Sequence, residues 1–166
     1  MAANESRRFR YTGDDEKDPY HYTECGLDNV FLVSGYDLEE TEEGPSVSVK
    51  CADDLLRAIG RFLASEKKLL SGKELRFLRN QMDLTQAELA KLVGTTDQSV
   101  ARWEKDICSV PGAADYLIRV LYLEHAHENV SVRDLLEALE ERDEDEYSQK
   151  SHFYKSAEGW KPRMIA

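Results

Sequence analysis

Residues 86–104 read QAELAKLVGTTDQSVARWE, and their spacing is that of two short helices joined by a tight turn. Ala90 is small enough for two helices to meet over it. Gly94 stands where a sharp turn needs a positive φ, which glycine adopts at little cost. Val100 supplies a buried contact on the second helix. Because the turn is short, the second helix crosses the first steeply and keeps one side exposed, as in a helix-turn-helix.

The exposed side of this second helix carries polar side chains suited to nucleic acid. Gln and Arg can bind the edges of adenine and guanine through paired hydrogen bonds. The alternative is a plain helical hairpin with solvated charges, but a small residue, a glycine and a β-branched residue in this register together favour DNA binding. The side chains expected to face bases are Asp97, Gln98, Ala101 and Arg102. Those expected to contact phosphates are Lys73, Thr85, Gln86, Thr96, Ser99 and Lys105.

Helix-start signals surround this motif and predict a domain of five helices over residues 71–142. In a capping box, Ser or Thr is followed three residues later by Glu, and the two side chains bond the first backbone N–H groups of the helix. Other helices begin at a single Ser or Thr cap or just after a proline. The signals are Ser71–Glu74, Thr85–Glu88, Thr96, Pro111 and Ser131.

A small α+β domain is expected before the helices, over residues 19–66. Its β-prone runs predict about three short strands at 20–23, 30–33 and 46–49, and helical spacing of apolar residues predicts one helix at 52–64. The acidic stretch 38–44 has the composition of a turn. The side chains expected to hold the sheet on the helix are Phe31, Val33, Val47 and Val49 on the strands and Leu56, Ile59 and Phe62 on the helix.

The two ends of the chain differ from both domains in composition. Residues 1–18 are polar and are expected to be a flexible leader. Residues 143–166 are an acidic run followed by scattered aromatic residues, and are expected to be a mobile tail that orders on a partner. The fold class expected for the whole chain is mainly α: the five-helix domain preceded by the small α+β segment.

Charge is distributed unevenly along the chain, whose net charge is −11. Residues 66–105 carry a net +2, whereas residues 1–65 carry −7 and residues 106–166 carry −6. A negative net charge of this size argues against a protein that coats nucleic acid without sequence preference. Contact with a polyanion is therefore expected only through the middle of the chain. No apolar run approaches the roughly 20 residues of a membrane span. No signal peptide is visible, and three cysteines are too few for a disulfide framework. Together these two observations predict a cytoplasmic protein.

Several stretches of the sequence resemble known protein families. Residues 73–124 are similar to the five-helix domain of the XRE and λ-repressor class, of which residues 84–105, LTQAELAKLVGTTDQSVARWEK, are typical. Residues 20–36, YHYTECGLDNVFLVSGY, together with residues 72–93 and 100–124, resemble the MqsA-type (YgiT-like) antitoxins and regulators. The resemblance implies a dimer that binds a palindromic operator, and in some members an RNA-cleaving toxin that the protein neutralises. It also implies base contacts by Gln98 and Arg102, which match an Asn and an Arg in that family.

The chain departs from the founding members of this family at the expected metal site. Those antitoxins hold zinc with two Cys-x-x-Cys pairs, whereas Cys25 is followed by Asp28 at the matching position. Cys25, Cys51 and His21 would give three ligands, one fewer than a closed structural zinc site needs. We therefore expect no zinc and no other cofactor, and interpret Cys25 and Cys51 as small buried apolar residues.

Other reactive side chains have plain interpretations. His21 lies between two tyrosines with no nucleophile in view, and His125 and His127 are too close in sequence to share a helix face. Cys108 could serve as a redox switch only with a lowered pKa. The acidic run 137–146 is interpreted as a solvated helix end, with mimicry of nucleic acid as the alternative. No catalytic constellation is present, so an enzyme is not expected.

Two functions remain. The first is a sequence-specific DNA-binding transcriptional regulator, expected to act as a repressor and autoregulator and to bind a palindromic operator as a homodimer. The second is an antitoxin that neutralises a small RNase toxin by protein–protein contact and autoregulates its operon. In that case the acidic ends would cover a basic toxin surface.

Overall fold

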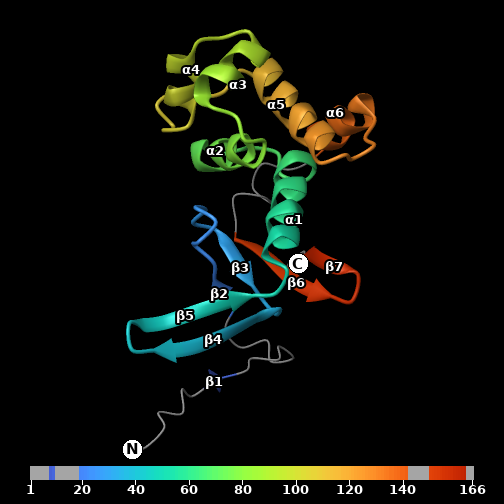
Figure 1. The fold of residues 1–166 in the computed structure, drawn as a ribbon. Helices are drawn as coiled ribbons and strands as arrows, with labels where there is room; N and C mark the ends of the chain where they lie inside the picture. The colour runs from blue at the N-terminus through green and yellow to red at the C-terminus, as the bar shows by residue number, and fades with distance from the viewer. Residues whose placement is uncertain (1–7, 10–18, 142–149, 164–166) are drawn as a thin grey trace, which may run out of the picture.

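The computed structural model describes residues 8–9, 19–141 and 150–163, which form two small sheets below a group of helices (Figure 1). The strands are β1 (Arg8–Phe9), β2 (Tyr20–His21), β3 (Val30–Leu32), β4 (Tyr36–Thr41), β5 (Gly44–Val49), β6 (Ser151–Ser156) and β7 (Gly159–Arg163). The helices are α1 (Ala52–Ser65), α2 (Gly72–Gln81), α3 (Gln86–Val93), α4 (Asp97–Trp103), α5 (Gly112–His125) and α6 (Val132–Glu140). The described chain has six helices: α1 lies before residue 71, and α2–α6 lie within residues 71–142.

The first sheet has the strand order β1–β4–β5, and all its pairs are antiparallel. The expectation of a turn over the acidic stretch 38–44 is wrong for residues 38–41, because β4 runs from Tyr36 to Thr41. Its apolar residues alternate and face apolar partners on β5: Tyr36 pairs with Val49, and Leu38 pairs with Val47. This period of two places Asp37 and Glu39 on the other face. The expected leader 1–18 contributes β1, and its other residues lie outside those described.

The second sheet has the strand order β2–β3–β6–β7, with β6 parallel to β3. The interpretation of residues 143–166 as a mobile tail is wrong for residues 150–163, which form the β6–β7 hairpin; residues 143–149 and 164–166 lie outside those described. Phe153 on β6 is fully buried, and Trp160 on β7 donates from its indole nitrogen to the Lys50 carbonyl oxygen at 2.8 Å. The aromatic residues therefore belong to the core.

Helix α1 packs across one face of the second sheet. The rings of Phe62 and Phe153 meet edge to face, with centroids 5.8 Å apart. Val30 and Leu32 are buried on this inner face, whereas Phe31 points to the opposite face and is only half-buried. The expectation that Phe31 packs on α1 was wrong by one residue in phase, which in a strand exchanges the two faces.

The helices α2–α6 begin at the expected residues. Both capping boxes are present, at Ser71 and at Thr85, and the side chains of Thr96 and Ser131 each accept a backbone N–H of the following helix. Pro111 directly precedes α5. The core between these helices contains Leu75, Leu78, Leu89, Val100 and Ile118, each fully buried.

One buried arginine joins the sheets to the helices. Arg119 of α5 is 0 % exposed, and its guanidinium donates to the carbonyl oxygens of Leu63 at 2.8 Å and of Lys67 at 2.5 Å, at the end of α1. The last carbonyls of a helix have no partner within the helix, so a buried end needs such donors. Arg119 also pairs with Asp115 at 2.9 Å. This contact fixes α1, and with it the second sheet, against α5.

Candidate nucleic-acid interface

Helices α3 and α4 are joined at the three residues that the sequence indicated. Ala90 of α3 is buried, Gly94 ends α3 with φ 73°, and Val100 of α4 is fully buried. The Thr95 N–H donates to the Ala90 carbonyl oxygen at 2.8 Å and closes the turn. Because Val100 and Trp103 both point inward, the opposite side of α4 is left at the surface.

The expected base-facing residues lie on this outer side of α4. Gln98 and Arg102 are exposed and one helical turn apart, and Ala101 between them is half-buried. Asp97 is also exposed, but its carboxylate accepts the Gln98 N–H at 2.9 Å, at the start of the helix. The amide and guanidinium groups therefore project from one surface with the small Ala101 beside them.

The expected phosphate contacts divide into two groups. Thr85, Thr96 and Lys105 are exposed, and Ser99 is half-buried with its hydroxyl 2.9 Å from that of Thr96. Thr85 already donates from its hydroxyl to Glu88 at 2.8 Å, and the remaining two residues also have partners within the chain. Lys73 forms an ion pair with Asp28, and the Gln86 amide donates to Glu104 at 2.8 Å.

Glu104, directly after α4, is a buried carboxylate that the sequence interpretation missed. It is 3 % exposed and accepts hydrogen bonds from Arg79 at 2.5 Å, Gln86 at 2.8 Å and Arg76 at 3.2 Å. Burial alone would raise the pKa of Glu104, but these donors outweigh burial and hold its pKa below the ordinary value. Its position four residues after buried Val100 was the available signal, because an acid on an inward helix face needs a partner.

A second buried polar contact holds the loop between β2 and β3 against α2. Glu74 is 1 % exposed and accepts from the Lys67 ammonium at 2.5 Å and from the Asn29 amide at 3.1 Å. Lys73 and Asp28 pair next to it. The loop between β2 and β3 therefore rests on the first turn of α2, which explains why Lys73 is not free.

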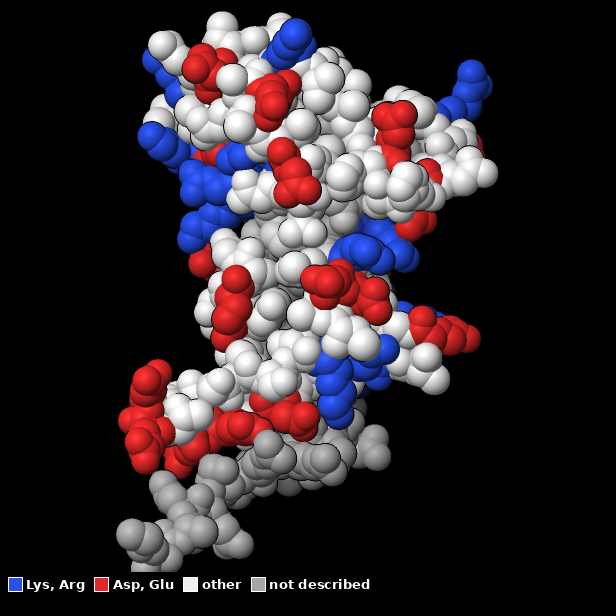
Figure 2. All heavy atoms as spheres, in the orientation of Figure 1, with Lys and Arg blue, Asp and Glu red and all other residues white. Residues whose placement is uncertain are grey.

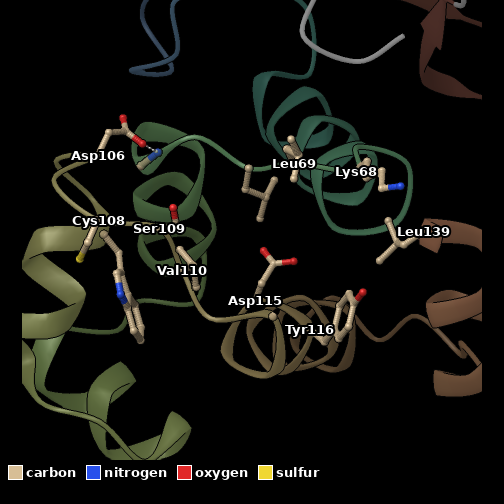
Figure 3. A pocket seen from close by; sticks show the side chains of 13 residues that line it. Lys68, Leu69, Asp106, Cys108, Ser109, Val110, Asp115, Tyr116 and Leu139 are labelled. Atoms are coloured by element: carbon tan, nitrogen blue, oxygen red, sulfur yellow. Dashed lines mark hydrogen bonds between the residues drawn. The ribbon is translucent and has the colours of Figure 1, made fainter. Parts of the chain in front are cut away.

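A cavity of about 370 Å³ lies behind the helix-turn-helix, between the α1–α2 connection, the loop after α4, α5 and α6 (Figure 3). Asp115 points into it from α5, with Leu69 opposite and Val110 and Tyr116 on either side. Burial raises the pKa of Asp115 above its ordinary value, although Arg119 opposes this. The Asp106 carboxylate at its edge accepts the Gly72 N–H at 2.7 Å and ties the end of α4 to the start of α2.

Charges of the two signs gather over different elements. Lys and Arg side chains line the flank over α2–α4, and Asp and Glu side chains gather at the end of the β4–β5 hairpin (Figure 2). This distribution agrees with the sequence, in which only the middle of the chain has a positive balance.

The cysteines and histidines do not gather into a site. In the described part of the chain, no group of three or more His, Cys, Asp and Glu side chains is placed to hold a metal ion. Cys25 is half-buried, and burial raises the pKa of its thiol. Cys51 is exposed, which corrects its interpretation as a buried residue, because it starts α1 at the surface with φ 51°. Cys108 is exposed as well.

None of the helices among the described residues combines the length and apolar character that crossing a membrane requires. No curated protein and no solved structure matches the chain significantly. Residues 75–108 match the helix-turn-helix family model, a range that spans most of α2, all of α3 and α4, and Glu104. This part of the chain is therefore a helix-turn-helix of the XRE type, the DNA-binding unit of transcription regulators.

Proposed function

We propose that the protein is a sequence-specific transcriptional regulator that binds a palindromic operator as a homodimer, with α4 in the major groove. The observation that carries this proposal is the exposed side of α4, where Gln98 and Arg102 stand one turn apart above buried Val100 and Trp103. An α-helix fits the major groove, and two-fold dimers read two half-sites about one turn of DNA apart or a multiple of it.

Arg102 and Gln98 are assigned the base contacts, with Asp97 and Ala101 as their neighbours on the same surface. Lys105, Thr85, Thr96 and Ser99 are assigned phosphate contacts, which fix the register but carry no sequence information. Gln86 and Lys73 have partners within the chain, so a phosphate contact by either would exchange or share that partner. The proposal includes no metal and no catalytic step.

The test is a titration of a fluorescent duplex from the region upstream of the gene, with random duplex as competitor. A regulator of its own promoter binds the upstream duplex at least about tenfold more tightly than random DNA, because specific sites typically exceed non-specific ones by three or more orders of magnitude. A footprint with two symmetric halves supports the dimer. Equal affinity for both duplexes would contradict the proposal.

A second candidate is an antitoxin of the MqsA type, favoured by the acidic β4–β5 hairpin. This hairpin extends from the body of the protein, and its strands and turn contain Asp37, Glu39, Glu40, Glu42 and Glu43 but no Lys or Arg (Figures 1 and 2). Such a charge suits a basic RNase surface. Co-expression with the product of a neighbouring gene tests it: rescue of growth, lost when Glu39 and Glu40 are replaced by Lys, supports the antitoxin, and unchanged rescue contradicts a role for this hairpin.

A further inference from the structure

The second sheet has an outer face, the side turned away from α1. The strand register places His21, Phe31, His152 and Arg163 in one row across β2, β3, β6 and β7, because each is the direct partner of the next. Tyr154 and Lys161 form the next row on the same side, since they pair two residues further along β6 and β7. The fold does not use this face to cover α1, which packs on the inner face through Phe153.

Three rings of the first row are stacked. The rings of His21 and Phe31 are 4.6 Å apart and nearly parallel, at 9°, and those of Phe31 and His152 are 5.3 Å apart at 23°. The Lys150 ammonium lies 5.0 Å from the centre of the Phe31 ring. The stack ends at His21 on the edge strand β2, where the side chain is exposed. A further flat ring can therefore extend the stack at this edge.

The charge of this sheet is opposite to that of the protein. Its four strands contain no Asp or Glu, although the chain has a net charge of −11. Glu158, in the β6–β7 turn, forms an ion pair with Lys161. The basic side chains of the outer face are Lys150, Lys161 and Arg163, together with the imidazoles of His21 and His152.

We propose that this outer face binds a single strand of nucleic acid. Phosphates lie along Lys150 and Arg163, and along Lys161 if it exchanges its partner Glu158 for a phosphate. A base stacks on the open side of the His21 ring and extends the stack of His21, Phe31 and His152. Proteins that bind single strands combine these two elements: cationic side chains that follow the backbone, and aromatic rings on which bases of any sequence stack. The inference goes beyond the proposed function, because this sheet and α4 lie in different parts of the molecule (Figure 1).

A single strand suits this surface better than a duplex. A double helix hides the faces of its bases, so it could use only the cations and would leave the stacked rings without a partner. An acidic protein would likewise use only the charges. Stacking is thus the part of the prediction that separates a single strand from the other two partners.

The experiment is a fluorescence titration of the full chain with a labelled 12-nucleotide single-stranded RNA of mixed sequence. Lys150→Ala with His152→Ala should weaken binding by about tenfold or more, because one phosphate contact and one end of the ring stack are removed together. Phe31→Leu keeps an apolar side chain but removes the central ring, and should weaken binding by about fivefold or more. Lys50→Ala is the matched control, since Lys50 is an exposed lysine outside this sheet, and should leave binding unchanged.

Two further arms separate this inference from the proposed function. Arg102→Ala with Lys105→Ala should abolish operator binding and leave binding of the single strand intact, whereas the outer-face variants should do the reverse. If the α4 variant loses both ligands, or if the outer-face variants bind the RNA as tightly as the unchanged protein, the inference is wrong. Equal competition by a duplex or by poly-glutamate would also overturn it. Lys150→Glu, a single change at an exposed position, gives the answer if the double variant does not fold.

Discussion

Arg79 of α2 donates a hydrogen bond to Glu104 at 2.5 Å, and this pair joins the helix before the helix-turn-helix to the residue that follows α4. Arg79 also donates to the Leu84 carbonyl oxygen at 2.7 Å, in the loop before α3. One guanidinium thus links α2 to the loop before α3 and to the residue that follows α4. Because α4 has only seven residues, its orientation depends on such contacts more than on its own hydrogen bonds.

Arg79→Ala should destabilise the protein by about 3 kcal/mol, because it leaves the Glu104 carboxylate buried without its main partner. The Glu104 side chain is 0 % exposed and that of Arg79 is 12 % exposed. Urea unfolding followed by circular dichroism measures the change. Arg57→Ala is the control, since Arg57 pairs with Asp54 at 3.8 Å at the surface, and should cost less than about 0.5 kcal/mol. Equal losses would show that Glu104 does not depend on Arg79.

The lowered pKa of Glu104 predicts a loss of stability in acid. A carboxylate whose pKa is lower in the folded protein than in the unfolded chain adds stability above its unfolded pKa, and this contribution disappears as the pH falls through the folded value. The ordinary pKa of a glutamate side chain, about 4.5, stands for the unfolded chain. Urea midpoints should therefore fall more steeply below pH 4.5 in the unchanged protein than in Glu104→Gln, which cannot titrate. Parallel curves would contradict this assignment.

Arg102→Ala and Gln98→Ala should each lower operator affinity by about 1–3 kcal/mol and reduce discrimination against random DNA, while the melting temperature stays unchanged. Lys105→Ala should weaken binding to all duplexes alike and reduce its salt dependence. Lys91→Ala, an exposed lysine of α3, serves as the control. Full operator affinity in Arg102→Ala would show that another surface reads the bases.

Gly72→Ala should destabilise the protein, because a Cβ there would lie 2.5 Å from the Trp103 carbonyl oxygen and 2.7 Å from the Glu104 carbonyl carbon. Both atoms belong to the backbone and cannot rotate away, so a loss of about 1–3 kcal/mol is expected. Gly112 also begins a helix, and nothing lies within 4 Å of a Cβ placed on it. Gly112→Ala should therefore be neutral or slightly stabilising. Thermal melts of the two variants and the unchanged protein measure this difference.

The protein should fold without metal. Cys25, Cys51 and His21 provide one ligand fewer than a closed zinc site needs. Elemental analysis of protein purified without a histidine tag should show less than one zinc per chain, and EDTA should leave the circular dichroism spectrum unchanged. The prediction would be contradicted by one zinc per chain whose removal with EDTA also abolishes the circular dichroism signal of the strands. The metal would then contribute to folding.

The helices could be predicted from the sequence because their signals are local. Ser71 and Glu74, or Thr85 and Glu88, are three residues apart, and the structure shows both capping boxes. The second sheet could not be predicted in the same way. Val30 pairs with Ser151, a partner more than a hundred residues away, and no local pattern indicates it. The phase of β3 depended on the same missing partner, since only Phe153 and α1 decide which face of β3 is turned inward.

The candidate interface was likewise predictable only where its signals are local. The exposed side of α4 follows from the spacing of Ala90, Gly94 and Val100, which is a local pattern. The engagement of Gln86 by Glu104 and of Lys73 by Asp28 was not predictable, because each joins elements whose relative position is set by packing of the whole protein.

The pairing of β3 with β6 also has a consequence for biosynthesis. Strand β3 leaves the ribosome early, but its partner at residues 151–156 follows only after all of α1–α6 has been made. Translation therefore delivers a complete helix-turn-helix while the second sheet still lacks two of its four strands. Since domains fold as units while the chain is being made and distant pairings form slowly, the DNA-binding helices should fold first on the nascent chain and the second sheet should close last.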